Sequence, residues 1–275
     1  MPRTLIAAHR GGADLWPENS ILAFRQTAET PVELVEFDVH RTSDGILVVH
    51  HDATIDRMTD GTGAIASMSF AELSRHVIRG TGGERIPTLA EVIAVFRDSP
   101  VDLRLEIKTG VSFRAYADIE AEIVEFLRTQ GMLSRTMLTS FMLPVLSEAR
   151  QALVDDTTLG LVWLVSPMVL ACAGRAGVID SARTHGVREV GLNATDLTDD
   201  LAEFFGRQDF TVHAWAAHTR QAADRMFALN VASFTTDRPD LALEARGEFA
   251  RGWSDTQLAA RWAADAPLFV VCCVG

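Results

Sequence analysis

Apolar and β-branched residues are concentrated in short runs along the whole chain, and stretches with helical spacing of apolar residues separate most of these runs. The nine runs cover residues 5–9, 34–40, 46–51, 102–108, 136–141, 158–164, 188–193, 210–215 and 231–236. The helical stretches cover 21–29, 88–97, 115–130, 142–152, 167–185, 197–206 and 219–229. Strands that alternate with helices predict a parallel sheet flanked by helices.

One connection is too short to fit this alternation. Only residues 41–45 join the second run to the third, and Asp44-Gly45 is typical of a tight turn. Because a parallel crossover needs about a dozen residues or more, we expect an antiparallel hairpin here. The remaining eight runs with their helices predict a closed (β/α)8 TIM barrel. A doubly wound open sheet is the alternative, disfavoured because polar residues follow many strands and are not confined to one crevice.

The whole chain, residues 1–275, is expected to form a single barrel domain. The glycine-rich segment from about 53 to 87 is interpreted as an insertion over one face, with one short helix at 69–76. From about 244 to 275 we expect a C-terminal helix followed by an apolar tail, Leu268-Phe269-Val270-Val271. This tail would pack either on the barrel or on a second subunit of a homo-oligomer.

Charge and composition narrow the classes of partner. The net charge of -12 argues against a nucleic-acid or anionic-membrane surface, although a few local cations can still hold a phosphate substrate. No apolar stretch approaches the roughly 20 residues of a membrane span, and the first apolar run is too short for a signal peptide. The three cysteines give no disulfide framework. We therefore expect a cytoplasmic protein.

Acidic residues lie at the ends of two predicted strands. Glu36 and Asp38 share one face of the second run because strand side chains alternate. Their mutual repulsion is on the order of 2–3 kcal/mol at about 6–7 Å, so a cation is needed to offset it. Glu106 and Lys108 share a face of a later strand. The carboxyl ends of barrel strands converge on one site, so this pattern predicts a metal-assisted active site.

The other polar residues at strand ends complete this chemistry. Three carboxylates without a thiolate favour Mg²⁺ or Ca²⁺; zinc held by His9, His51 and a carboxylate is the weaker alternative. Arg10 and Lys108 suit an anionic oxygen, and phosphate is the natural candidate. His9 and His51 can serve as general base and general acid. A hairpin turn centred near residue 43 or 44 would place His51 roughly opposite Glu36.

A series of motifs over about residues 5–240 resembles the glycerophosphodiester phosphodiesterase family. The motifs are His9-Arg10-Gly11, Pro17-Glu18-Asn19-Ser20, Glu36-Phe37-Asp38-Val39, Val48-Val49-His50-His51-Asp52, Asp56-Arg57-Met58-Thr59, Gly61-Thr62-Gly63, Ile86-Pro87-Thr88-Leu89, Leu105-Glu106-Ile107-Lys108 and Thr236-Asp237-Arg238-Pro239-Asp240. The resemblance implies a (β/α)8 barrel of the PLC-like phosphodiesterase type. It also implies hydrolysis of glycerophosphodiesters to sn-glycerol 3-phosphate and an alcohol, a step of glycerol and lipid metabolism.

The resemblance further implies roles for individual residues. By position, the metal ligands are Glu36, Asp38 and Glu106, and the acid/base pair is His9 and His51. Arg10 and Lys108 match phosphate-contacting residues, and Trp215 matches an aromatic wall beside the glycerol. Where the family often has Thr-Val-Asn after this tryptophan, the chain has Ala216-Ala217-His218, which puts the usual alcohol preference in doubt.

Several readings remain as alternatives. A related barrel phosphodiesterase would act on a lysophospholipid, inositol or sugar phosphodiester. A non-catalytic barrel that binds phosphorylated ligands is disfavoured because the full set of acids, histidines and cations is present.

Asp237 is interpreted as the cap of a helix near Pro239. Glu18 is expected to act locally at the start of the first helix, and apolar residues at helical spacing are assigned to the core.

Overall fold

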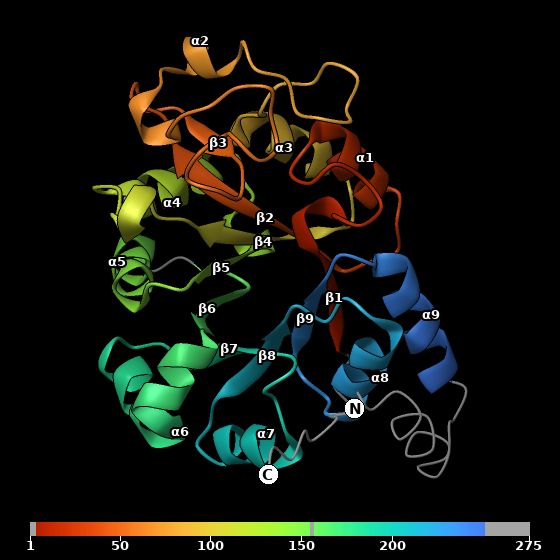
Figure 1. The fold of residues 1–275 in the computed structure, drawn as a ribbon. Helices are drawn as coiled ribbons and strands as arrows, with labels where there is room; N and C mark the ends of the chain where they lie inside the picture. The colour runs from red at the N-terminus through yellow and green to blue at the C-terminus, as the bar shows by residue number, and fades with distance from the viewer. Residues whose placement is uncertain (1–3, 155–156, 251–275) are drawn as a thin grey trace, which may run out of the picture.

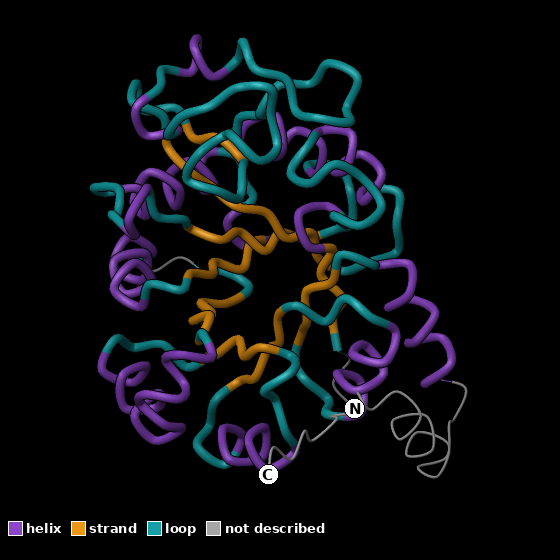
Figure 2. Tube along the Cα trace, viewed as in Figure 1, coloured by secondary structure: helices purple, strands orange, loops and turns teal. Residues whose placement is uncertain are grey.

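The computed structural model describes residues 4–154 and 157–250, and parallel strands close into a barrel at its centre (Figure 1). The ring runs β1-β2-β4-β5-β6-β7-β8-β9, and it closes because β1 pairs with both β2 and β9. Figure 2 shows these strands encircled by helices. The bounds are β1 Leu5–Ala8, β2 Leu34–Arg41, β4 Asp102–Ile107, β5 Thr136–Ser140, β6 Gly160–Val165, β7 Glu189–Asn193, β8 Thr211–Trp215 and β9 Ser233–Thr236. The predicted (β/α)8 barrel is confirmed, and the open sheet is wrong.

The predicted hairpin is also present. Strand β3 (Leu47–Val49) pairs antiparallel with β2, and Gly45 turns the chain with φ 86°. The register joins Val39 to Val49, so the hairpin centres on residue 44 and position 51 falls opposite position 37. His51, expected roughly opposite Glu36, therefore falls one residue away from that position. Half a residue in the turn centre is enough to produce this shift, because the two strands run in opposite directions.

Short polar side chains begin most of the barrel helices, because they can accept a hydrogen bond from an otherwise unpaired N–H of the first turn. Ser20, Thr88, Ser166, Thr198 and Thr219 do this for α1, α3, α6, α7 and α8. The bounds are α1 Ile21–Ala28, α3 Leu89–Phe96, α4 Ile119–Thr129, α5 Leu143–Leu153, α6 Pro167–Thr184, α7 Asp199–Gly206, α8 Arg220–Ala228 and α9 Pro239–Ala250. Within 4–154 and 157–250, no helix combines the length and apolar character of a membrane span.

The helix expected near Pro239 is α9, which starts at Pro239, where proline suits the first helical turn. It continues past residue 244 to Ala250, so the helix expected from about residue 244 is, within the described residues, the second half of α9. The apolar tail Leu268-Phe269-Val270-Val271 and the pair Cys272-Cys273 lie outside the described residues.

The segment 53–87 follows β3 and consists largely of loops (Figure 2). It has a small hydrophobic cluster, and the helix expected at 69–76 is the single turn α2 (Phe70–Leu73), which Ser69 and Glu72 cap reciprocally. The cluster contains Val48, Ile55, Ile65, Leu73, Ile78 and Ile86. This cluster holds the segment beside the hairpin, from which His51 and Asp52 continue.

The two faces of the barrel strands differ in chemistry. Outward side chains such as Phe37 and Leu105 join the large core beneath the helices. Inward side chains on the same strands include Glu36 and Arg104. The Arg104 guanidinium is buried and crosses the barrel, where Nη1 donates a 3.0 Å hydrogen bond to the Ser233 hydroxyl. Burial lowers the pKa of Arg104 to about 10, which still leaves it charged.

His213 continues this buried network, with Nδ1 2.8 Å from the Ser233 hydroxyl and Nε2 3.0 Å from a Glu189 carboxylate oxygen. Burial holds the His213 pKa below its ordinary value of 6.5, although Glu189 acts in the opposite direction. The folded protein therefore keeps His213 neutral at a pH where the unfolded chain binds a proton. Stability from this site is present above pH 6.5 and declines below it.

We expect His213→Gln to flatten this pH dependence. The free energy of unfolding of the wild type should fall as the pH is lowered from 7 to 5.5. The variant has no imidazole at this position to bind a proton on unfolding. Its free energy of unfolding should therefore fall less than that of the wild type, by up to about 1.4 kcal/mol per pH unit. Urea unfolding of both proteins at the two pH values provides the measurement. Parallel declines would show that His213 does not bind this proton on unfolding.

Candidate active site

One cavity of about 240 Å³ opens at the carboxyl ends of the barrel strands. Six of the predicted site residues line it, and Asp38 and Lys108 contact these residues from beside it. The lining is His9, Arg10, Glu36, His51, Arg104, Glu106, Thr139, Phe141, Leu164, Trp215, Ala216, His218 and Thr235. The structure therefore brings all the predicted residues into one neighbourhood.

Three buried carboxylates form the acidic part of this site. Glu36 and Asp38 extend from β2 and Glu106 from β4, and the register places Asp38 beside Glu106. Each offers an oxygen within 4.8 Å of the others. Burial, followed by the charge of Asp38, raises the pKa of Glu36 to about 7. The cluster is therefore short of positive charge at Glu36.

Two cations contact the acids directly. Lys108 Nζ lies 2.9 Å from Glu106 Oε1 and 3.2 Å from Asp38 Oδ1, and Arg10 Nε lies 3.6 Å from Asp38 Oδ2. Although burial acts the other way, Lys108 keeps the pKa of Asp38 well below its usual range. Asp38 Oδ1 is buried and accepts no hydrogen bond, although the Lys108 ammonium lies beside it. A carboxylate oxygen that accepts no hydrogen bond among three acids fits a hard divalent cation.

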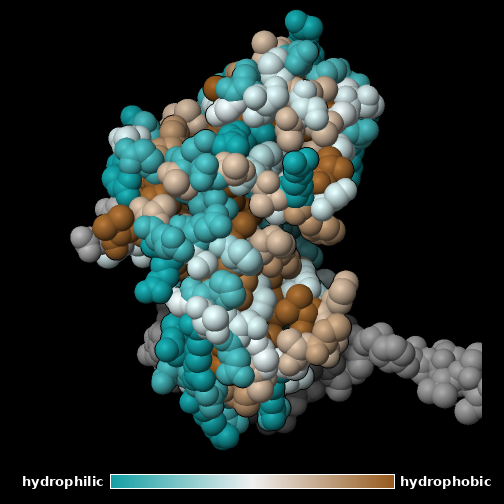
Figure 3. All heavy atoms as spheres, turned by 90° about the vertical axis from the view of Figure 1, so that its left-hand side faces the viewer, coloured by the Kyte–Doolittle hydropathy of each residue, from teal (hydrophilic) through white to brown (hydrophobic). Residues whose placement is uncertain are grey.

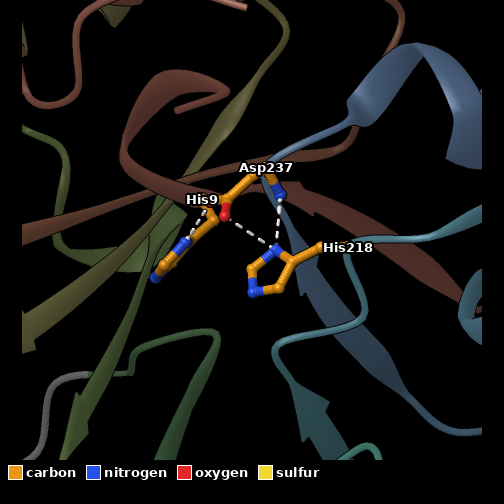
Figure 4. A group of neighbouring side chains, drawn as sticks. All are labelled: His9, His218 and Asp237. Atoms are coloured by element: carbon orange, nitrogen blue, oxygen red, sulfur yellow. Dashed lines mark hydrogen bonds and ion pairs between the residues drawn. The ribbon is translucent and has the colours of Figure 1, made fainter. Parts of the chain in front are cut away.

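His9 follows β1 and is held by a carboxylate from the far end of the chain. Its Nδ1 lies 2.5 Å from Asp237 Oδ1 (Figure 4), and its Nε2 lies 3.9 Å from Glu36 Oε2. Although burial opposes the charge, Glu36 and then Asp237 raise the pKa of His9. His9 can therefore carry a proton beside the acidic cluster.

Asp237 lies between two imidazoles, which the sequence did not predict. Its other oxygen, Oδ2, lies 2.9 Å from His218 Nδ1 (Figure 4). The same nitrogen is 3.0 Å from the Asp237 backbone N–H, so it can accept from the amide or donate to the carboxylate, but not both at once. The interpretation of Asp237 as only a helix cap is thus wrong. The one available signal was its motif at the end of a predicted strand.

His51 has a carboxylate partner of its own. Its Nδ1 lies 2.7 Å from Asp52 Oδ1, and Arg57 Nε donates a 2.6 Å hydrogen bond to Asp52 Oδ2. Burial opposes the charge of Asp52, but Arg57 and then His51 lower its pKa to about 2. Arg57 also contacts Glu18 through both terminal nitrogens, and Glu18 accepts from Arg10. Glu18 therefore links two cations of the site, a role beyond the local one expected of it.

Aromatic side chains form the apolar side of the cavity. The Trp215 indole N–H donates to the Gly191 carbonyl at 3.1 Å. The Trp215 ring meets Phe141 edge to face with centroids 5.3 Å apart, and Leu164 lies on the same lining. His40, His50 and His213 are buried and hydrogen-bonded, which is typical of structural histidines.

Comparisons with known proteins agree on one family. The model of the glycerophosphoryl diester phosphodiesterase family matches residues 9–241. A glycerophosphodiester phosphodiesterase of Caldanaerobacter subterraneus is 28% identical over 86% of this chain and 96% of its own length. The human glycerophosphodiester phosphodiesterase 1 is 34% identical over 57% of this chain, which spans 49% of the human protein.

Two solved structures extend the comparison. A putative glycerophosphoryl diester phosphodiesterase of Agrobacterium tumefaciens has a TM-score of 0.87 and 38% identity, over 90% of this chain and 99% of the other. An Oleispira antarctica phosphodiesterase in complex with the product sn-glycerol-3-phosphate shares the fold, with a TM-score of 0.76 and 23% identity, over 88% and 96% of the two chains.

Proposed function

The chain belongs to the glycerophosphoryl diester phosphodiesterase family, and we propose that it hydrolyses glycerophosphodiesters to sn-glycerol 3-phosphate and an alcohol. Family membership makes it a phosphoric diester hydrolase. One observation carries the proposal: three carboxylates, two carboxylate-bound histidines and two cations converge on a single cavity. The sn-glycerol-3-phosphate in the Oleispira protein, which has this fold, supports the choice of product.

We assign Glu36, Asp38 and Glu106 as ligands of one divalent cation, Mg²⁺ or Ca²⁺. The Asp38 oxygen that accepts no hydrogen bond and the raised pKa of Glu36 both fit added positive charge at this point. When bound, such a cation supplies positive charge to the anionic phosphodiester. In the second cluster of ligand-type side chains, His9, His218 and Asp237, both Nδ1 atoms already contact the Asp237 carboxylate.

The side chains around the acids would bind and orient the substrate. Arg10 and Lys108 would donate hydrogen bonds to phosphate oxygens, exchanging part of their contact with Asp38. Trp215 and Phe141 would present an apolar wall to the glycerol carbons. The departing alcohol would then lie toward the insertion at 53–87, near His51 and Arg57.

His9 and His51 would move the protons. Each has Nδ1 against a carboxylate, so Nε2 is the nitrogen left for the substrate. One histidine would take the proton of the attacking oxygen, and the other would protonate the departing alkoxide. Asp237 and Asp52 would hold the rings in position and stabilise the protonated imidazoles, as the carboxylate of a catalytic triad does.

The first prediction tests the activity and its metal together. With Mg²⁺ or Ca²⁺ present, glycerophosphocholine should yield glycerol 3-phosphate, measured by coupling to its dehydrogenase. EDTA should abolish turnover, because the acidic cluster would lose its counter-charge, and added metal should restore it. Full turnover in chelator would contradict the metal assignment, and no product under any metal would contradict the proposed substrate.

The second prediction concerns the two histidines. His9→Ala and His51→Ala should each lower kcat by about 10²–10⁴-fold, the usual contribution of general acid–base catalysis. Metal binding, followed by calorimetry, should persist in both because neither residue is an assigned ligand. If a variant keeps near wild-type kcat, the histidine that it replaces does not take part in acid–base catalysis.

The third prediction concerns the carboxylate that orients His9. In Asp237→Asn the amide can donate a hydrogen bond to His9 Nδ1, which would place the imidazole proton on Nε2. We expect kcat to fall about tenfold or more, as when a triad aspartate is replaced by asparagine. Steady-state kinetics on glycerophosphocholine provide the test, with thermal unfolding as the check on folding. A kcat within twofold of wild type in a folded variant would show that Asp237 does not set the tautomer.

A further inference from the structure

The barrel interior below the acidic cluster contains a cation to which the proposed function gives no role. Hydrophilic side chains cover much of the face in Figure 3, where water can solvate their charges. Arg104 instead lies inside the barrel and is only 1% exposed, yet it belongs to the lining of the cavity. The register pairs Asp38 with Glu106 and Glu36 with Arg104, so Arg104 lies two residues deeper than Glu106. Arg104 therefore forms part of the cavity floor.

The Arg104 guanidinium has few partners for a buried cation. Nη1 donates to the Ser233 hydroxyl, whereas Nη2 is buried and has no hydrogen-bond partner among the described residues. Glu36, Glu106 and Glu189 favour the charge of Arg104 through space and not through a hydrogen bond. A buried donor without an acceptor is unfavourable, and a guanidinium carries five N–H donors. A ligand with an anionic oxygen would satisfy Nη2 most strongly.

The barrel wall beside Nη2 supplies no such acceptor. The wall consists there of Gly191 and Leu164, because a Cβ at position 191 would lie 3.6 Å from Nη2 and 2.8 Å from the Leu164 side chain. Leu164 has no polar side-chain atom, and Gly191 has no side chain. The Gly191 carbonyl already accepts a 3.1 Å hydrogen bond from the Trp215 indole. An acceptor for Nη2 would therefore come from the cavity.

This position suits the part of the substrate that stays attached to the phosphate. In the proposed function the phosphate is held by the acidic cluster, Arg10 and Lys108, and the glycerol carbons lie along Trp215. The terminal carbon of the glycerol is the carbon farthest from phosphorus, so it can extend past the acidic cluster toward the floor. A hydroxymethyl group at this carbon offers Arg104 a neutral oxygen. A carboxylate offers two anionic oxygens in a plane that matches the guanidinium.

A carboxylate fits this floor better than a second phosphate. Nη2 is the one Arg104 nitrogen that is buried without a hydrogen-bond partner among the described residues. Glu36 and Glu106 line the same cavity. A phosphate dianion would meet more repulsion from these two carboxylates than a singly charged group would.

We propose that Arg104 forms a subsite for a carboxylate, and that the preferred substrates are phosphodiesters of glycerate, in which a carboxylate replaces the terminal hydroxymethyl group of glycerol. This rests on the proposed function, whose phosphodiester chemistry it keeps. Water forms the new P–O bond, the P–O bond to the alcohol breaks, and a proton of the water passes to the alcohol oxygen. The products are 3-phosphoglycerate and the alcohol.

Calorimetric titration with two matched phosphates tests the subsite. 3-Phosphoglycerate has a carboxylate, and glycerol 3-phosphate a hydroxymethyl group, at the end that would face Arg104. Both would be titrated at equal free Mg²⁺ into the wild type, Arg104→Met and Arg104→Lys. His213→Gln is the matched control, because His213 contacts Ser233 in the same buried network but does not line the cavity.

The wild type should bind 3-phosphoglycerate about tenfold or more tightly than glycerol 3-phosphate, as one charge-assisted hydrogen bond would produce. Arg104→Met should reduce this ratio to about twofold or less, whereas Arg104→Lys, which keeps the charge without the planar fork, should keep part of it. His213→Gln should keep the wild-type ratio. In wild-type turnover, the choline ester of 3-phosphoglycerate should be hydrolysed with a higher kcat/KM than glycerophosphocholine, and both release choline.

Equal affinity for the two phosphates in the wild type would overturn the subsite, and this comparison needs no variant to fold. An unchanged ratio in Arg104→Met would overturn it as well. A matching loss in His213→Gln would also do so, because a general disturbance of the interior would then account for the effect.

Two further outcomes separate the subsite from the proposed function. Hydrolysis of glycerophosphocholine together with equal binding of the two phosphates would overturn the subsite and leave the proposed function intact. The expected binding ratio without hydrolysis of either diester would support the subsite and overturn the proposed function.

Discussion

Three carboxylates buried beside three cations are the interaction on which the rest of this structure depends. Glu36, Asp38 and Glu106 are nearly inaccessible to water, where unpaired charges are strongly unfavourable. Lys108 and Arg10 contact them at the mouth, and Arg104 lies buried within the barrel, its charge favoured by Glu36 and Glu106. The cations come from the ends or the interior of β1 and β4, so they approach the carboxylates only when β1, β2 and β4 are neighbours. Barrel closure and the acidic cluster therefore support each other.

The two histidines depend on this closure in different ways. His9 meets Asp237 because β1 pairs with β9, which joins the beginning of the barrel to its end. His51 instead depends on the hairpin and on the insertion, whose Arg57 fixes Asp52 and reaches Glu18. One histidine is thus oriented by the barrel itself and the other by a segment added to it. The insertion therefore has a direct part in the geometry of the site.

Local periodicity was sufficient to predict much of this arrangement from the sequence. Alternation along strands placed Glu36 beside Asp38, and the short link at residues 41–45 separated the hairpin from the eight barrel strands. Contacts that form only when the barrel closes could not be predicted from local periodicity. One of them joins Asp237 to His9, which lie 228 positions apart in the sequence. The alignment of His51 depended on the centre of a turn, which sequence reasoning places only to within a residue. The exposed start of α6, residues 167–173, was missed because apolar residues at helical spacing normally face a core.

The central claim is that the acidic cluster is built for one divalent cation, and calorimetric titration of Mn²⁺ or Mg²⁺ into the metal-free protein tests it most directly. Glu106→Gln removes one assigned ligand. Glu189→Gln removes a carboxylate of the barrel interior that contacts His213 instead. The account predicts one ion per chain in the wild type and in Glu189→Gln, and at least about tenfold weaker binding in Glu106→Gln. Equal affinity in all three proteins would contradict it.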